Sequence, residues 1–118
     1  MAPYPFFTDL LYPLPIVEKK MFGVTSYYLE DKIIAAMNIN EQWAADIGIW
    51  ISTPVETQPE LTKFISNYRY LKRIPAKKWI LLPADSDTFE EDASIIAALI
   101  IKRSPLIGTV PKKKKPQI

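Results

Sequence analysis

The sequence contains no cysteine and no histidine, and only three of its 118 residues are glycine. Without cysteine the chain has no disulfide, no thiolate metal site and no thiol nucleophile. Without histidine it has neither a Ser-His-Asp triad nor a His-ligated zinc site. Three glycines cannot supply a phosphate-cradling loop, and the sequence shows no dinucleotide fingerprint or nucleophile elbow. These absences predict a non-enzymatic protein that carries no metal and no cofactor.

A long hydrophobic segment is absent as well. The longest apolar run covers residues 93–101 and is interrupted by Ser94, whereas a helix that crosses a bilayer needs about 20 apolar residues. Residues 1–15 lack the basic start of a signal peptide and are broken by several prolines. The sequence therefore predicts a soluble protein of the cytoplasm that has no membrane partner.

The net charge of +2 comes from the lysines Lys112 to Lys115, because without them 11 basic residues stand against 13 acidic ones. These lysines lie in residues 111–118, a Lys- and Pro-rich segment that we expect to be a disordered basic tail. Flexible lysines attract polyanions, and they also serve simply to keep a chain in solution. Residues 1–110 are expected to form one domain, since that length is typical of a single domain.

Alternation of apolar and polar residues predicts strands, and apolar residues at helical spacing predict helices. The predicted strands cover residues 17–22, 25–29, 33–37, 46–53 and 77–82. The predicted helices are a short one over residues 5–12, a second that begins at a capping box in residues 57–60, and a third over residues 87–103. The second helix is expected to continue through a stripe formed by Leu61, Phe64, Ile65 and Tyr68. The fold class that follows is α+β: one domain with an antiparallel sheet of about five strands, two main helices and a short N-terminal helix.

The third predicted helix has an unusual distribution of apolar residues. Every residue from 95 to 101 is apolar, and a helix that is apolar all round must be covered on every side. The domain itself or a partner would provide that cover, and the partner would be a second copy of the chain or another protein. The predicted interface residues are Ile95, Ile96, Leu99 and Ile100.

Several segments resemble the N-terminal domain of the TfoX family over residues 5–108. The resemblance is carried by Lys20-Met21-Phe22-Gly23, by the hairpin in residues 28–33, by residues 48–51 and by residues 78–83, which end in Leu-Pro. Val24 stands where the family commonly has a second glycine. The MmcQ/YjbR group, which also has a late Lys-Trp strand, is the second choice. The resemblance implies a small antiparallel α+β domain without catalytic residues. It also implies a regulatory role near transcription and natural competence, exerted through protein contacts.

A basic and aromatic stretch supports an alternative function. Residues 63–79 contain six cations, no acid and interleaved aromatic rings, which is the combination that binds single-stranded nucleic acid. The competing interpretation is a solvated face whose rings pack inward. The predicted nucleic-acid contacts are Lys63, Arg69, Lys72, Arg73, Lys77, Lys78 and Trp79.

Two further groups of residues have side chains that could form a site. An acidic cluster extends over residues 85–92 and has the oxygen ligands that a hard cation prefers, but helix capping explains Asp87 and Glu90, so no metal site is predicted. The strand aromatics Tyr28, Trp50 and Trp79 would line a ligand pocket or belong to the core.

Overall fold

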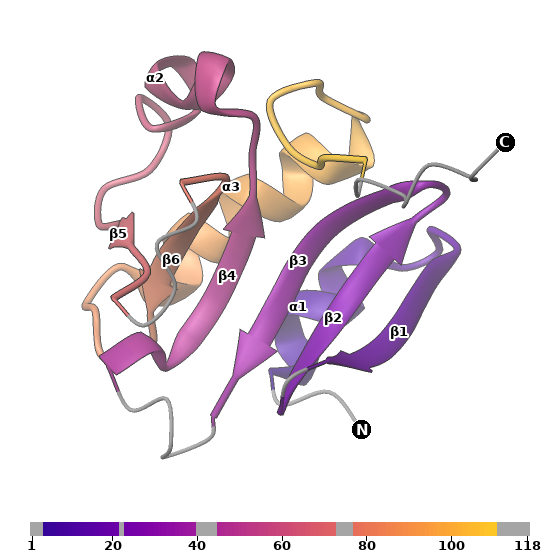
Figure 1. Ribbon diagram of the computed structural model, residues 1–118, viewed down its shortest axis with the longest axis horizontal. Coiled ribbons are helices and arrows are strands. Elements are labelled where there is room, and N and C mark those ends of the chain that lie inside the picture. Colours follow the sequence, from indigo (N-terminus) through magenta and orange to yellow (C-terminus); the bar gives the residue numbers. More distant parts are fainter. Residues whose placement is uncertain (1–3, 22, 40–44, 73–76, 111–118) are drawn as a thin grey trace, which may run out of the picture.

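The computed structural model describes residues 4–21, 23–39, 45–72 and 77–110. These residues form one α+β domain with a six-stranded antiparallel sheet in the order β1-β2-β3-β4-β6-β5 (Figure 1). The strands are β1 Ile16–Met21, β2 Val24–Leu29, β3 Lys32–Asn38, β4 Gly48–Ser52, β5 Arg69–Tyr70 and β6 Trp79–Pro83. The helices are α1 Pro5–Leu11, the 3₁₀ helix η2 Val55–Thr57, α2 Gln58–Leu61 and α3 Phe89–Ile101.

The predicted fold class is confirmed, with β5 as the strand that the sequence did not predict. The predicted tail, residues 111–118, lies outside the described residues.

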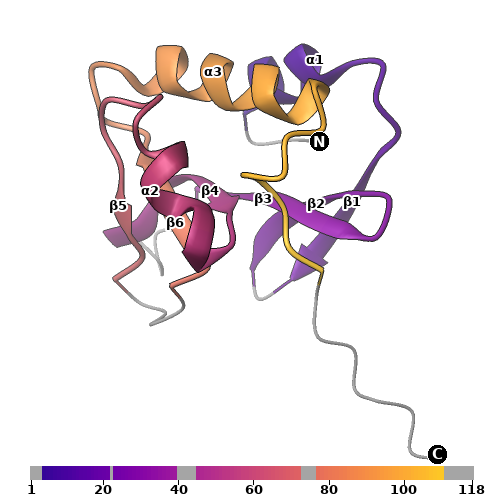
Figure 2. The ribbon, with the colours of Figure 1, turned by 90° about the horizontal axis from the view of Figure 1, so that it is seen from above.

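Helices α1 and α3 lie side by side over one face of the sheet (Figure 2). They meet through aromatic rings, since Phe89 of α3 packs edge-on against Tyr4 and Phe6 with centroid distances of 5.3 and 5.8 Å. Phe7 of α1 and Ile96 of α3 are fully buried against the sheet. The short N-terminal helix thus covers a second side of α3, which explains much of the apolar band in that helix.

Strand β4 is buried on both faces of the sheet. Ile49 and Ile51 belong to the main core under the helices, whereas Trp50 belongs to a small cluster on the opposite face. That second cluster contains Val24, Ala36, Trp50, Leu71 and Leu81. The predicted alternation of β4 is therefore correct, and its second face is apolar because it supports this smaller core.

The second predicted helix is much shorter than expected. The sequence predicted a capping box at Thr57 and a helical stripe that continued to Tyr68, but α2 ends at Leu61. Thr57 makes no capping bond, because its hydroxyl donates to the carbonyl of Pro54 at 3.1 Å. Asp87 is likewise not the N-cap of α3, which is Thr88. The chain after α2 follows another path because its backbone amides bind a buried carboxylate, described below.

The segment after α3 returns to the sheet and is hydrogen-bonded to it. Thr109 exchanges backbone hydrogen bonds with Ile33 at 2.9 and 3.1 Å, and the amide of Gly108 donates to the carbonyl of Ser52 at 2.7 Å. The hydroxyl of Thr53 donates to the carbonyl of Leu106 at 2.8 Å. We call residues 106–109 the C-terminal clasp, because they join the ends of β3 and β4 (Figure 1).

Tyr27 provides a prediction about stability at high pH. Burial, together with the hydrogen bond to Glu18 at 2.8 Å and the charge of Glu18, raises the pKa of Tyr27 well above its ordinary value of 10.0. The folded state therefore holds the phenolic proton more tightly than the unfolded chain. Below pH 10 the contribution of Tyr27 to the free energy of unfolding is complete. Above pH 10 the phenol of the unfolded chain ionises first, so the free energy of unfolding falls by up to about 1.4 kcal/mol per pH unit.

Tyr27→Phe is expected to flatten that alkaline decline, as measured by urea denaturation between neutral and alkaline pH. The matched control is Tyr12→Phe, since Tyr12 is 82% exposed. An equal alkaline decline in wild type and Tyr27→Phe would contradict the assignment.

Candidate functional site

The segment from residue 62 to residue 72 carries three of the four exposed aromatic side chains of the described chain, and the fourth is Tyr12. It leaves α2, runs along the edge of the sheet and forms β5, which pairs with β6 (Figure 1). Phe64 is 51% exposed, Tyr68 41% and Tyr70 50%, and Val55 of η2 is 47% exposed. We call these four residues the aromatic surface. Exposed apolar side chains mark an interaction surface where they lie next to one another. Val55, Tyr68 and Tyr70 line one groove, and Phe64 lies outside its lining.

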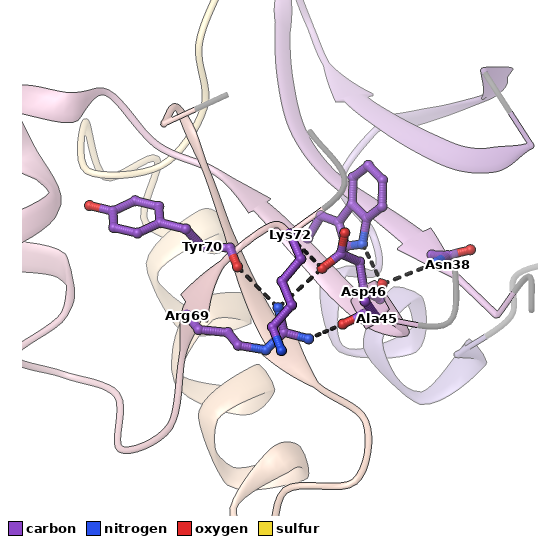
Figure 3. Close-up of polar contacts among 7 residues, drawn as sticks. Asn38, Ala45, Asp46, Arg69, Tyr70 and Lys72 are labelled. Atoms are coloured by element: carbon purple, nitrogen blue, oxygen red, sulfur yellow. Dashed lines mark hydrogen bonds and ion pairs between the residues drawn. The ribbon is translucent and has the colours of Figure 1, made fainter. Parts of the chain in front are cut away.

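An ion pair between the buried carboxylate of Asp46 and the partly exposed guanidinium of Arg69 holds the end of this segment in place (Figure 3). The carboxylate of Asp46 has no exposed area; it accepts hydrogen bonds from Arg69 Nη1 at 3.1 Å and from the amide of Lys72 at 2.9 Å. The backbone carbonyl of Asp46 accepts from the indole of Trp50 at 2.8 Å and from the side chain of Asn38 at 3.0 Å. Asp46 thus connects three strands of the sheet with the residues after β5.

Arg69 reaches Asp46 because of the strand register. Arg69 lies opposite Leu81, which lies opposite Trp50, so all three side chains are on the face of the sheet away from α1 and α3. The guanidinium also donates to the carbonyls of Ala45 and Tyr70. A two-residue strand has few ladder hydrogen bonds of its own, and this network attaches β5 more firmly to the sheet.

A second buried carboxylate holds the middle of the same segment. Asp92 of α3 is 1% exposed and accepts from the amides of Ser66 and Asn67 at 2.8 and 3.1 Å, and from the hydroxyl of Thr88 at 2.7 Å. If α2 were longer, the amides of Ser66 and Asn67 would donate to carbonyls within the helix. Here they donate to Asp92 instead, so they remain hydrogen-bonded. Asp92 and Asp46, which are the buried carboxylates of the described chain, therefore fix this segment at residues 66–67 and at residues 69–72.

A groove of about 520 Å³ lies between α2 and β5, lined by Val55, Gln58, Pro59, Thr62, Tyr68 and Tyr70. Gln58 is buried, and its polar atoms are already bonded: it accepts from the hydroxyl of Tyr70 at 2.8 Å and donates to the carbonyls of Thr53 and Lys77. What the groove offers to a partner is consequently the aromatic rings and the aliphatic surfaces of its walls.

The predicted nucleic-acid contacts are only partly available. Lys63, Lys72, Lys77 and Lys78 are exposed. Arg69 is engaged by Asp46, and Trp79 packs edge-on against Trp50 at 6.0 Å. Arg73 lies outside the described residues.

The predicted interface residues of α3 divide into two pairs. Ile96 and Ile100 are 0% and 2% exposed and face the sheet, while Ile95 and Leu99 are half-buried against the same core. Among the described residues of α3, Ile101 is the large apolar side chain that is exposed, at 46%. An interface on this helix stays a prediction, and it would use the narrow strip around Ile101.

The acidic cluster and the strand aromatics have structural roles. Asp92 binds the backbone, as described, and the described residues contain no group of three or more acidic side chains that could hold a metal ion. Trp50 belongs to the second core and Trp79 packs against it. Tyr28 lies beneath the ammonium group of Lys19, 5.1 Å from the ring centroid.

Comparison with models of known protein families finds no match, and comparisons with curated proteins and with solved structures find no similar chain. The resemblance to the TfoX N-terminal domain therefore remains a prediction from the residues quoted above. Within the part of the chain that the structure describes, no helix has the length and apolar character needed to traverse a membrane.

Sequence reasoning missed the anchoring roles of Asp46 and Arg69. The available signal was a lone acid, Asp46, two residues before the apolar strand β4, since such a position places a carboxylate near the end of a buried strand. Arg69 is one of six cations in residues 63–79, and no sequence pattern distinguishes it from the other five.

Proposed function

We propose that this protein is a non-enzymatic, cytoplasmic protein-interaction module that binds a peptide segment of a partner over the aromatic surface. The observation that carries the proposal is the combination of exposed rings with a backbone fixed at two places by Asp92 and Asp46. Aromatic side chains are enriched at the centres of protein interfaces. A rigid backbone lowers the entropy lost on binding, so a fixed surface of this kind favours affinity.

The resemblance to the TfoX N-terminal domain supports a regulatory setting for this module, linked to transcription or competence. A module of that kind acts by contacting another protein, and the partner would be a regulatory protein or a second copy of the chain. The groove between α2 and β5 supplies the contact surface that such a role needs.

Nucleic-acid binding is the second candidate, because exposed lysines flank the same tyrosines. Three observations favour a peptide. Asp46 neutralises Arg69, the acidic side chains Glu56 and Glu60 are exposed on η2 and α2 next to the groove, and acids outnumber bases once Lys112 to Lys115 are set aside. A broad phosphate-binding surface needs a clear excess of cations.

Selection from a displayed library of random peptides tests the proposal. Enriched peptides are expected to bind the wild-type chain and to lose about tenfold in affinity with Phe64→Ser or Tyr68→Ser, since each removes a ring from the contact. The chain offers closely matched controls: Val17 is 51% exposed, as is Phe64, and Leu10 is 41% exposed, as is Tyr68. Val17→Ser and Leu10→Ser should leave affinity unchanged.

The proposal fails if no peptide is enriched, or if the selected peptides bind all four variants as they bind wild type. Retention of a single-stranded oligonucleotide at low salt, with affinity that falls steeply as salt is added, would instead establish the second candidate.

A further inference from the structure

A cavity of about 200 Å³ lies between the C-terminal end of α3 and the hairpin that joins β2 to β3, remote in the sequence from the aromatic surface. Its floor is apolar and consists of Leu29, Ile34, Ile100 and Ile107. All four belong to the main core, where three of them are at most 3% exposed and Leu29 is 6% exposed. A ligand that entered this cavity would therefore place its apolar part against well-packed aliphatic side chains.

The mouth of the cavity is charged. Lys32, Arg103 and Glu30 line it, and Arg103 Nη1 donates to Glu30 Oε2 at 2.6 Å. The two cations and one acid leave a net positive mouth over the apolar floor. Lys32 lies along one side, where its aliphatic stem is close to Gly108 of the C-terminal clasp.

The backbone at this mouth is unusual. Glu30 has φ of 59° and Arg103 has φ of 57°, and these are the non-glycine residues with positive φ in the described chain. Side chains other than glycine resist that conformation, and residues held in it cluster at functional sites. Here both such residues line the same cavity and bind each other.

Each of these positions ordinarily suits glycine. Glu30 begins the tight turn between β2 and β3. Arg103 follows the last turn of α3, where the amide of Ser104 donates to Leu99 at 3.0 Å and the amide of Arg103 donates to Ile100 at 2.9 Å, as in a Schellman motif. An ion pair between half-exposed side chains adds little to stability, so fold stability does not account for two charged residues at these positions.

We propose that this cavity binds a small apolar monocarboxylate, with its hydrocarbon part on the aliphatic floor and its carboxylate on Arg103 and Lys32. A guanidinium binds a carboxylate through two parallel hydrogen bonds, and the ligand would replace Glu30 as the partner of Arg103. An enclosed apolar cavity of about 150 Å³ holds benzene, so this volume suits a ligand the size of benzoate or hexanoate. The site is independent of the peptide-binding proposal.

Titration of the full chain with sodium hexanoate, followed by amide NMR, tests the inference. Saturable shifts are expected for residues 29–34 and 99–108, with weaker binding of hexanol, which lacks the charge, and of hexylamine, which reverses it. Arg103→Asn is expected to weaken hexanoate binding at least about tenfold, the loss typical of a charge-assisted hydrogen bond. Asparagine tolerates the left-handed backbone, so this variant keeps the fold.

Lys102→Ala is the matched control, because Lys102 is an exposed cation adjacent to Arg103 that does not line the cavity. It should bind hexanoate as wild type does. Three results would overturn the inference: no saturable shift, equal binding of hexylamine and hexanoate, or unchanged affinity in a folded Arg103→Asn protein.

Discussion

Asp46→Ala is expected to lower the free energy of unfolding by about 2–3 kcal/mol, the loss typical when hydrogen-bond donors lose a buried charged acceptor. Asp46 has no exposed area, and its carboxylate binds both Arg69 and the amide of Lys72. The alanine variant leaves that amide without its acceptor and the guanidinium without its counter-charge. Urea denaturation followed by circular dichroism measures the loss.

The same substitution should also impair the aromatic surface, because β5 would lose its connection to Asp46. Asp9→Ala is the control: Asp9 is an exposed residue of α1, and its replacement should change stability by no more than about 0.5 kcal/mol. Asp46→Asn keeps the shape and one acceptor oxygen, so its loss should be smaller than that of alanine. A loss below about 1 kcal/mol for Asp46→Ala would show that the pair does not stabilise the sheet.

Gly48→Ala is expected to destabilise the fold by about 4 kcal/mol or more, enough to leave little folded protein. Gly48 begins β4 with φ of 149°, a conformation that other residues rarely adopt. A Cβ at this position would overlap the carbonyl oxygen of Leu82 and would lie 3.0 Å from the amide nitrogen of Ala84. Backbone atoms of a central strand cannot move aside without breaking the β4–β6 pairing.

Gly108→Ala separates the two causes of the loss expected for Gly48→Ala, which are backbone strain at positive φ and steric overlap with Leu82. Gly108 also has positive φ, at 98°, but its added Cβ would lie 3.2 Å from Cδ of Lys32, a flexible side chain that can shift. The expected loss is about 1–3 kcal/mol, which is the strain of the backbone alone. Thermal unfolding of both variants checks the order, and an equal loss in the two would exclude the overlap at Leu82 as the dominant cause.

Local patterns were sufficient to predict most of the sheet. Alternation identified β4, and the short connections around Gly23 and Glu30 identified the β1–β2–β3 hairpins. β5 was missed because Arg69 and Tyr70 are too few to show a period, and their pairing with β6 depends on Asp46, which is far away in the sequence.

The α2 prediction failed for a related reason. Leu61, Phe64 and Ile65 have helical spacing, but local spacing cannot report that Asp92 attracts the amides of Ser66 and Asn67. The candidate site was therefore predicted only as a list of residue types. Asp46 and Asp92 determine which cations are neutralised and which rings are exposed. Their partners come from distant segments, so local patterns do not show them.

The C-terminal clasp has a consequence for the sequence of events in folding. Ile33 and Thr109 are far apart along the chain, and bringing such distant residues together is entropically unfavourable until other contacts exist. We expect the β1–β2–β3 meander, which closes over short turns, to form early and the clasp to join late. Interactions that form after the transition state act mainly on the rate of unfolding. A carboxylate seated beside the clasp would accordingly prolong the lifetime of the native protein while leaving its refolding rate nearly unchanged.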